Sequence, residues 1–417
     1  MKNTLEAPSS ERGAVLVHVA LAMIALMSFS TFVVDYGVLW TARRQAQNAA
    51  DAGALAGAVA LAFDNPSDFS NTGPAKTSAY QMLMSHPIWG QQPVVNITTD
   101  ITFPPCPDDA TTTCVRVDVY RNTAHGNALP MIFGQLVGLN TQNVRAMAMA
   151  KVAMATATDC LKPWGVVDKW DEYVPTTQPW TDTAVFEKYI TNGPNKGTPD
   201  PLLTPPDNYI PPTTSSPGTG FHPFNPDKSY TTDYGRQIRL TVGDKTDFQF
   251  ASGWFAPLAL FDSTGGNDYK NNIKGCVGTT YEIGQDIPVD TEPGLKVGPT
   301  EQAVNSDVDS IVNRDPTAVW DTTLNPPYGG IANSAFGVSP RIVLVPLVNP
   351  DQMAEVNKGG RTTVTISNIM GFFVEGYNTS TKTVVGRLVT TAGQMKIGTS
   401  PPIGGTSSFL QAIVLIR

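Results

Sequence analysis

The longest apolar stretch of the chain lies close to its N-terminus. Residues 14–34 read AVLVHVALAMIALMSFSTFVV, in which His18 is the only ionisable side chain. A helix over these residues is about 30 Å long, which matches the hydrocarbon core of a bilayer. The apolar core of a cleaved signal peptide is shorter, about 7–15 residues, and a buried core helix rarely needs so long an apolar run. The pattern therefore predicts an uncleaved transmembrane helix, preceded by a short cytoplasmic tail over residues 1–12.

Aromatic and basic residues follow the apolar stretch directly. They are placed as in a membrane interface, where aromatic rings form a belt and basic side chains reach the water. The residues concerned are Tyr36, Trp40, Arg43 and Arg44. Because Lys2 and Arg12 precede the stretch, basic residues are balanced on its two sides, and charge alone does not decide the orientation.

The helix is expected to continue beyond the membrane. Residues 41–62, TARRQAQNAADAGALAGAVALA, contain no proline and are rich in alanine, the best helix former. A stop signal, Asp-Asn-Pro, follows at residues 64–66. We therefore expect one helix over residues 13–63, of which the second half lies outside the bilayer.

Small residues form a stripe on this second half. Ala49, Gly53 and Gly57 recur at every fourth position, so that another element can approach the helix closely along one face. Packing of this stripe against the chain's own body is the favoured interpretation. Assembly with another helix, including a second copy of this chain, is the alternative.

Alternating apolar and polar residues predict a small α+β domain over residues 64–158. The alternation is typical of half-buried strands, and the proposed order is helix, two strands, helix and strand. The predicted elements are a helix at Ala75–Ser85, strands at Val94–Phe103 and Cys114–Tyr120, a short helix at Pro130–Val137, and a strand at Val144–Met154.

The remaining residues, 159–417, predict a larger, β-rich and sandwich-like domain, so that the fold class as a whole is α+β. A proline-rich segment at about 175–226 cannot pair as central strands and is expected to be a surface insertion. One helix is expected at Thr300–Val312. The predicted strands are Gln237–Val242, Phe248–Ala251, Leu258–Phe261, Thr279–Ile283, Arg341–Val348, Thr362–Ile366, Gly371–Tyr377, Thr383–Thr390 and Phe409–Ile416.

All four cysteines follow the apolar stretch. Cys106 and Cys114 flank a turn-like loop, a spacing typical of a disulfide at the tip of a hairpin, which needs an oxidising compartment. Four cysteines allow three connectivities, and we favour Cys106–Cys114 together with Cys160–Cys276. Four unpaired, buried thiols are the alternative.

Composition and motifs indicate a protein that is not an enzyme. The 417 residues carry a net charge of −8 and only 15% charged residues, with no basic stripe, so nucleic acid is not an expected partner. No zinc-protease, nucleophile-elbow, phosphate-loop, dinucleotide-binding or CxxC motif occurs. The four histidines, His18, His86, His125 and His222, have no neighbour at ligand spacing. We therefore expect neither a metal nor another cofactor.

Two features of the larger domain allow a second interpretation. The segment from Asp262 to Asp268 is rich in oxygen ligands for Ca²⁺, but it lacks the spacing of an EF-hand and is better interpreted as a polar turn. Trp164, Trp170 and Trp180 could stack on sugars or on a proline-rich partner, and packing in the core is the favoured alternative.

The N-terminal region resembles the corresponding region of TadG-like Flp/Tad pilus-assembly proteins. The resemblance covers Glu11 to Ala58 and follows an order of short motifs: an Arg-Gly start, the apolar span, an aspartate at its far end, and a basic, Gln- and Asn-containing segment that leads into an alanine-rich helix. The matching positions are Arg12-Gly13, Asp35, Gly37, Arg43-Arg44-Gln45, Gln47 to Ala52 and Ala54 to Ala58. The segment Leu129–Ala150 also resembles the stretch that closes the first extracytoplasmic domain in that family.

This resemblance implies a single-pass protein of the bacterial inner membrane with its body in the periplasm. Its expected role is non-enzymatic assembly or anchoring of an adhesive pilus, with other pilus-assembly or envelope proteins as partners. A surface-exposed adhesin or glycan-binding protein is the alternative. Asp35 joins the predicted membrane-interface residues on the basis of this resemblance.

The start of the span also resembles a prepilin leader. Gly13 stands where processing occurs, but the fifth residue after it is His18 and not the glutamate that a pilus subunit uses to pair with its neighbour's terminal amine. A neutral imidazole supplies no such charge. We therefore expect the helix to be retained as a membrane anchor, and the chain not to be a filament subunit.

Overall fold

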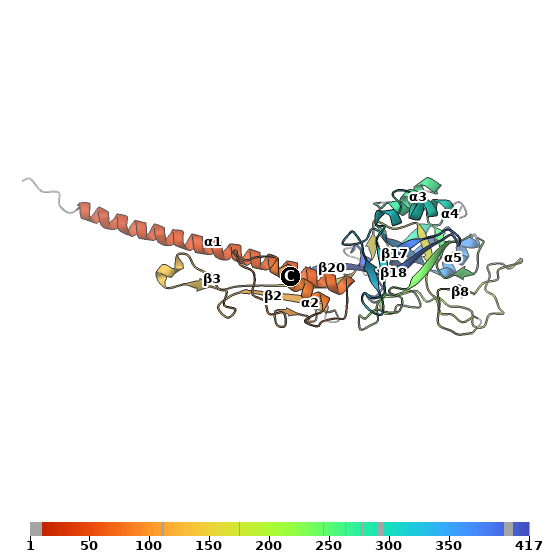
Figure 1. Cartoon of the computed structure of the whole chain (residues 1–417), viewed down its shortest axis with the longest axis horizontal. Coiled ribbons are helices and arrows are strands. Elements are labelled where there is room, and N and C mark those ends of the chain that lie inside the picture. The colour runs from red at the N-terminus through yellow and green to blue at the C-terminus, as the bar shows by residue number, and fades with distance from the viewer. Residues whose placement is uncertain are drawn as a thin grey trace, which may run out of the picture. The chain divides into compact units, whose positions relative to one another are not determined.

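The computed structural model describes residues 11–109, 112–174, 176–244, 246–262, 264–276, 278–290, 296–395 and 403–416. These residues form two compact units (Figure 1). The first contains residues 11–60, 68–151 and 414–416, and the second contains residues 61–67 and 152–413. The division near residue 151 falls slightly before the boundary that we expected at 158, and the first ten residues of the predicted tail lie outside the described residues.

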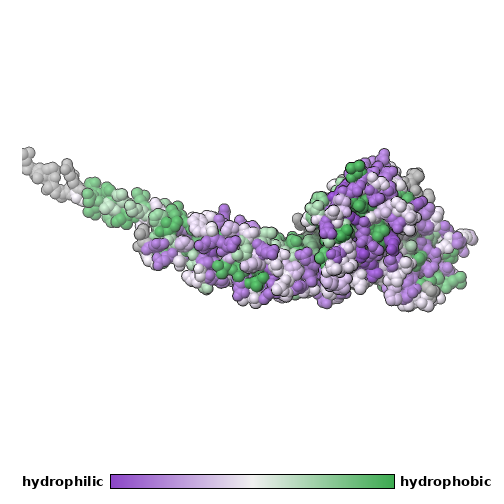
Figure 2. Space-filling model, viewed as in Figure 1, coloured by the Kyte–Doolittle hydropathy of each residue, from purple (hydrophilic) through white to green (hydrophobic). Residues whose placement is uncertain are grey.

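A single helix, α1 (Glu11–Phe63), forms the N-terminal part of the chain, as predicted. Among the described residues, one helix is long and apolar enough to cross a membrane, and it is this one. Its apolar side chains before Asp35 are exposed, and they form the hydrophobic end of the helix in Figure 2. From Asp35 onward the buried positions recur every three or four residues, which is the period of one helix face. These positions include Val38, Ala42, Ala46, Ala49, Ala50, Ala54 and Ala58.

The buried face of α1 packs within the first unit. The other elements of this unit are α2 (Pro74–Met84), β1 (Ile101–Thr102), β2 (Cys114–Arg121), β3 (Leu129–Pro130), the 3-10 helix η1 (Gly134–Val137), β4 (Thr141–Gln142) and most of β5 (Val144–Met154). Strands β2 and β5 pair antiparallel from Cys114 opposite Lys151 to Arg121 opposite Val144. The element order is the one predicted, but β1 is much shorter than the expected strand Val94–Phe103. Asn96 and Asp100 cause this, because their carboxyl and amide side chains accept backbone N–H groups and hold residues 96–100 in a turn.

The small-residue stripe is occupied by contacts inside the first unit. A Cβ atom added to Gly57 would lie 2.7 Å from Val115 Cγ1 of β2 and 3.2 Å from Ala79 Cβ of α2. One added to Gly53 would lie 3.3 Å from Leu83 Cβ and 3.4 Å from Val117 Cγ1. Ala49, in the same stripe, is fully buried. The stripe therefore packs on the chain's own body, and it gives no support to a homo-oligomer formed through this face.

The second unit contains a closed, barrel-like sheet. Its strands are β7 (Trp164–Val167), β9 (Gln237–Val242), β11 (Trp254–Pro257), β16 (Ile342–Val348), β17 (Thr363–Asn378) and β18 (Thr383–Val389). They follow the order β17-β16-β7-β11-β9-β18, and β18 pairs with β17 to close the sheet. The α+β class is thus confirmed, while the β-rich part is a barrel and not the sandwich-like pair of layers that we expected.

Alternate residues of all six strands share one buried cluster, which identifies the interior of the barrel. The cluster contains Val166, Leu240, Phe255, Val345, Phe372 and Leu388, one from each strand. Glycine permits the strong curvature: a Cβ on Gly386 would lie 2.4 Å from the carbonyl oxygen of Phe373. Tyr269 and Ile273 of helix α3 (Gly266–Lys274) extend the same cluster.

Several elements of the second unit differ from the sequence-based expectation. The two strands expected at Thr362–Ile366 and Gly371–Tyr377 are one strand, β17, because Asn368 to Met370 continue the pairing with β16 past a register shift at Ser367. The strand expected at Leu258–Phe261 is wrong: the strand β11 ends at Pro257, and Leu260–Asp262 is a 3-10 helix. The helix expected at Thr300–Val312 is broken into α4 (Val297–Glu301), a π-helix (Gln302–Ser306) and a 3-10 turn (Val312–Arg314).

The remaining elements are short or peripheral. Helix α5 spans Pro350–Asn357, where Asn349 caps its first turn by accepting the N–H of Asp351. The short strands are β6 (Ala157–Thr158), β8 (Val185–Phe186), β10 (Phe250–Ala251), β12 (Tyr281–Glu282), β13 (Asp286–Pro288), β14 (Val319–Asp321), β15 (Gly330–Ala332) and β19 (Thr391–Ala392), and the last strand is β20 (Leu410–Ile416).

The proline-rich segment packs more tightly than a surface insertion. Phe186, Tyr209 and Phe221 are buried in the core of the second unit. The buried carboxylate of Asp207 accepts the backbone N–H groups of Tyr173, just before the segment, and of Glu187 within it. The expectation that this segment is a surface insertion is therefore wrong for Phe186, Tyr209 and Phe221.

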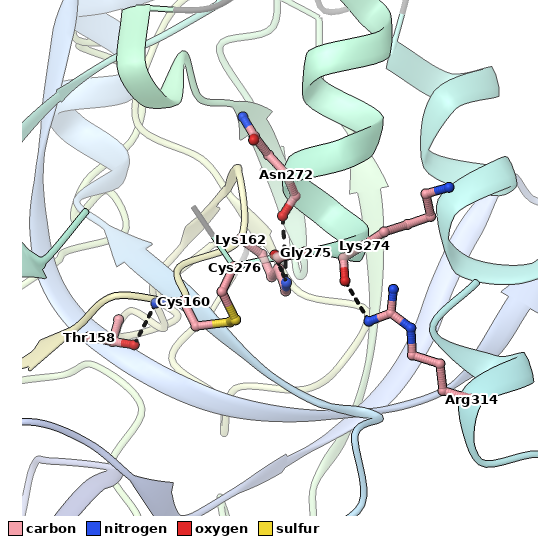
Figure 3. Close-up of a disulfide and its surroundings, with 8 residues drawn as sticks. All are labelled: Thr158, Cys160, Lys162, Asn272, Lys274, Gly275, Cys276 and Arg314. Carbon is pink, nitrogen blue, oxygen red and sulfur yellow. Dashed lines mark hydrogen bonds between the residues drawn. A yellow bond between two sulfur atoms is a disulfide. The ribbon is translucent and has the colours of Figure 1, made fainter. Parts of the chain in front are cut away.

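Both disulfides have the connectivity favoured from the sequence. Cys106 pairs with Cys114 in the first unit, and Cys160 pairs with Cys276 in the second. The second disulfide fastens the second residue after helix α3 (Figure 3). Beside it, Lys162 Nζ donates to the carbonyl oxygens of Gly275 and Asn272, at the C-terminal end of that helix. An N–H donor at this position is favourable because the last carbonyls of a helix lack intrahelical partners.

Candidate functional site

Asp35 stands on α1 at the point where the apolar stretch ends. Its carboxylate accepts three consecutive backbone N–H groups of the first unit: that of Ile132 at 2.8 Å, that of Phe133 at 3.2 and 3.3 Å, and that of Gly134 at 2.7 Å. These donors lie at the tip of a hairpin in which β3 pairs with β4, Leu129 opposite Gln142. Asp35 therefore joins the helix to this hairpin.

The carboxylate is almost completely withdrawn from solvent. Asp35 is only 4% exposed, and burial of a charge without partners is strongly unfavourable. Three N–H donors compensate for the lost hydration, and hydrogen bonds to a charged group contribute about 1.5–3 kcal/mol each. The bond between Gly134 and Asp35 connects two residues that are 99 positions apart in the sequence.

An apolar groove of about 510 Å³ runs between the helix and the hairpin tip. On the helix side it is lined by Ile24, Met27 and Phe32, which belong to the apolar stretch. Phe133 and Leu139 line the side of the hairpin. The groove therefore continues from the exposed apolar surface of α1 to Asp35.

The predicted interface residues form a ladder on the exposed side of the same helix. Tyr36 stacks on Phe32 and on Trp40, with ring centroids 5.8 and 6.5 Å apart. The Arg44 guanidinium lies 5.3 Å from the centre of the Trp40 ring, a cation–π contact. Tyr36 and Trp40 are both about half exposed, as belongs to amphipathic rings that meet a lipid headgroup region. Arg43 is exposed as well.

The polar residues of the Arg-Arg-Gln-Ala-Gln segment attach α1 to the rest of the first unit. The side-chain oxygen of Gln45 accepts the backbone N–H of Trp89 at 2.7 Å. Gln47 Nε2 donates to the carbonyl oxygen of Met147 at 3.0 Å and to Asp51 Oδ1 at 2.8 Å. Together with Asp35 these residues fix the rotation of the helix about its axis.

The partners of Asp35 could not be identified from side chains. The donors are backbone groups of residues 132–134, and a backbone N–H leaves no pattern in a sequence. The one available signal was the resemblance of Leu129–Ala150 to a family segment, which drew attention to the region but not to the interaction.

The tryptophans offered as sugar-stacking residues lie in the core. Trp164 and Trp170 are buried, and Trp170 packs edge-to-face on Trp180 with ring centroids 5.9 Å apart. Trp180 is half-buried: it packs edge-to-face on Phe221, and the Arg236 guanidinium lies 5.4 Å from the centre of its ring. The favoured alternative, core packing, describes them.

Candidate metal ligands do not gather in the part of the chain that the structure describes: no group of three His, Cys, Asp or Glu side chains is found there. The polar segment at 262–268 falls partly outside the described residues, at Ser263. His86, His125 and His222 each hydrogen-bond to a nearby residue, respectively Met82, Asn122 and Gly220.

Two buried ionisable groups of the second unit have displaced pKa values. Burial, assisted by the nearby Arg314 charge, lowers the pKa of Lys162 to about 7. Burial raises the pKa of Asp168 to about 6, although the N–H groups of Phe221 and Lys169 and the hydroxyl of Tyr209 act in the opposite direction. Both groups hold loops together through hydrogen bonds to backbone atoms.

The comparison with known families concerns the helix that carries the site. Residues 13–60 match the family model described as "Putative Flp pilus-assembly TadE/G-like". No curated protein and no solved structure matches the chain. The matched residues include Asp35, the interface ladder and the small-residue stripe. Over these residues α1 is thus similar to the TadE/G-like Flp pilus-assembly family, which confirms the resemblance of the N-terminal region to TadG-like proteins.

Proposed function

We propose that this chain is a non-enzymatic, membrane-anchored component of Flp/Tad pilus assembly. In this role α1 crosses the inner membrane once, and the two units contact pilus or envelope proteins in the periplasm. The observation that carries the proposal is the family match over residues 13–60, which coincides with the one described helix able to cross a membrane.

The two disulfides support the proposed orientation. Cys106–Cys114 and Cys160–Cys276 both lie after the apolar stretch, one in each unit. Disulfides persist in oxidising compartments such as the periplasm and are rare in the cytosol. They therefore support a periplasmic location for the body, a question that the balance of basic residues around the span left open.

A role as a membrane anchor for pilus assembly also accounts for the attachment of the first unit to α1 at Asp35. Side chains of α1 hold the first unit directly at the end of the apolar stretch, so that the body starts at the membrane surface without an intervening linker. A fixed platform of this kind suits a protein that positions partners at the membrane. The alternative role of a sugar-binding adhesin loses two of its three candidate residues, since Trp164 and Trp170 are buried.

The proposal is tested by deletion and complementation in the source bacterium, with the full chain carrying a C-terminal tag. We expect deletion to abolish surface Flp pili, and the tagged chain to restore them. The chain should remain in the inner-membrane fraction after alkaline extraction, and its tag should be digested by protease added to spheroplasts. Unchanged piliation in the deletion strain, or recovery of the chain as a stoichiometric part of sheared filaments, would contradict the proposal.

A further inference from the structure

The hairpin that Asp35 holds has an uncharged, apolar tip. Residues 131–140 read MIFGQLVGLN, without a single ionisable side chain. Ile132 is 52% exposed and Leu139 is 58% exposed, and Phe133 is also exposed. Side chains of this type are normally buried, so a cluster of them on one loop tip calls for a partner.

The tip lies beside the membrane-spanning part of α1. The groove that it forms with the helix reaches from Leu39 back to Ile24. Ile24 precedes Asp35 by eleven positions, which corresponds to about 16 Å along a helix, or roughly half of the hydrocarbon thickness. Figure 1 shows the β3 end of the first unit extending along α1. If α1 spans the bilayer, the tip lies at the level of one leaflet.

Six backbone N–H groups of the tip meet a principal requirement of a membrane environment. Lipid supplies no hydrogen bonds, so N–H groups within it must find partners in the protein. Asp35 accepts those of residues 132–134, and backbone carbonyls accept those of Met131, Gly138 and Leu139. The partners of the last three are Asn140, Gln135 and Gly134, respectively.

We propose that this hairpin tip is a second membrane-contacting element, which inserts into the periplasmic leaflet beside α1, with phospholipid acyl chains occupying the groove. The inference rests on the proposed membrane anchoring of α1. Acyl chains are the expected occupant because the groove continues the apolar surface of the span itself. In addition, neither the tip nor the helix residues that line the groove before Asp35 carry an ionisable group for a protein partner. In this arrangement the Asp35 carboxylate accepts backbone N–H groups of the tip that lipid could not pair with.

The test uses the full chain in phospholipid nanodiscs with one nitroxide label at a time. The four native cysteines are paired in disulfides, so a cysteine introduced by Ile132→Cys is labelled selectively. Val94→Cys is the matched control, because Val94 is an exposed apolar residue of the same unit, 47% accessible, outside the tip. Leu26→Cys, on the exposed apolar face of α1, reports whether the span itself is inserted.

The measured quantity is the ratio of collision with oxygen, which concentrates in lipid, to collision with a polar nickel chelate. We expect this ratio to be severalfold higher at residue 132 than at residue 94, and to approach that at residue 26. Equal ratios at 132 and 94, with a high ratio at 26, would overturn the inference while leaving the anchor intact. A low ratio at 26 would instead contradict the proposed anchoring and the inference with it. If the label at residue 132 were shielded from the nickel chelate in native membranes but not in nanodiscs, the tip would bind a protein partner. That result would also overturn the inference.

Discussion

The backbone N–H of Gly134 donates to Asp35 Oδ2 at 2.7 Å, across 99 positions of sequence. This bond joins the two segments that resemble the TadG-like family: the N-terminal helix and the stretch from Leu129 to Ala150. Asp35 is thereby explained as a residue that fastens a hairpin to the helix, in addition to its predicted place at a membrane interface. The rigid attachment places the first unit at the end of the apolar stretch.

Replacement of Gly57 by valine should weaken the attachment of α1 to its sheet. The first added carbon already lies 2.7 Å from Val115 Cγ1, and overpacking of this kind costs about 1–3 kcal/mol. Gly37→Val, on the same helix, is the matched control, since nothing lies within 4 Å of a Cβ at that position. Chemical unfolding in detergent should show a larger loss for Gly57→Val. Equal losses for the two variants would show that Gly57 does not face the sheet.

The two disulfides should differ in their contribution to stability. In the chain-entropy description, the loop closed by Cys160 and Cys276, at a separation of 116, contributes about 5 kcal/mol. The loop closed by Cys106 and Cys114, at a separation of 8, contributes about 2.6 kcal/mol. The double variant Cys160→Ala/Cys276→Ala should therefore unfold at lower denaturant than Cys106→Ala/Cys114→Ala. Peptide mapping without reductant that found free thiols at Cys160 and Cys276 would contradict the pairing on which this prediction depends.

Lys162 should make stability increase with pH above neutrality. Its pKa is about 7 in the folded chain against 10.5 for an ordinary lysine, so between these values the unfolded chain binds one more proton than the folded chain. Unfolding then takes up a proton, and the free energy of unfolding rises with pH by at most about 1.4 kcal/mol per unit. Lys162→Met should remove this slope, while Lys358→Met, at an exposed lysine of the same unit, should retain it. Denaturant titrations at pH 7, 8 and 9 measure the slope, and its persistence in Lys162→Met would refute the assignment.

The sequence predicted what depends on local pattern. The continuous helix followed from an apolar run joined to an alanine-rich segment, and β5 and β9 were placed at their observed bounds because their alternation is regular. Closure of the barrel could not be predicted, since it depends on pairings such as Val384 with Leu240 between strands far apart in the chain. Strand β7 was missed because its four residues are all buried and show no alternation.

Local sequence pattern predicted the helix side of the site but not the hairpin side. Asp35 and the aromatic and basic residues after it stand in a recognisable order on one helix. Their partners are backbone N–H groups and an apolar groove, which appear only when residues 131–139 are brought beside α1. The burial of Trp164 and Trp170 likewise depends on the closed barrel, and no sequence pattern distinguished it from exposure.

The central claim, that the Asp35 carboxylate holds the hairpin tip on α1, is tested most directly by amide hydrogen exchange at Ile132, Phe133 and Gly134 in the intact, micelle-embedded chain. Asp35→Ala removes the acceptor of all three N–H groups, and loss of about 2 kcal/mol of stabilisation corresponds to exchange roughly 30-fold faster. Asp51→Ala is the control, because this carboxylate lies on the same helix and accepts from Gln47. We predict acceleration at residues 132–134 in Asp35→Ala alone. Identical exchange at these three amides in the wild type, Asp35→Ala and Asp51→Ala would contradict the account.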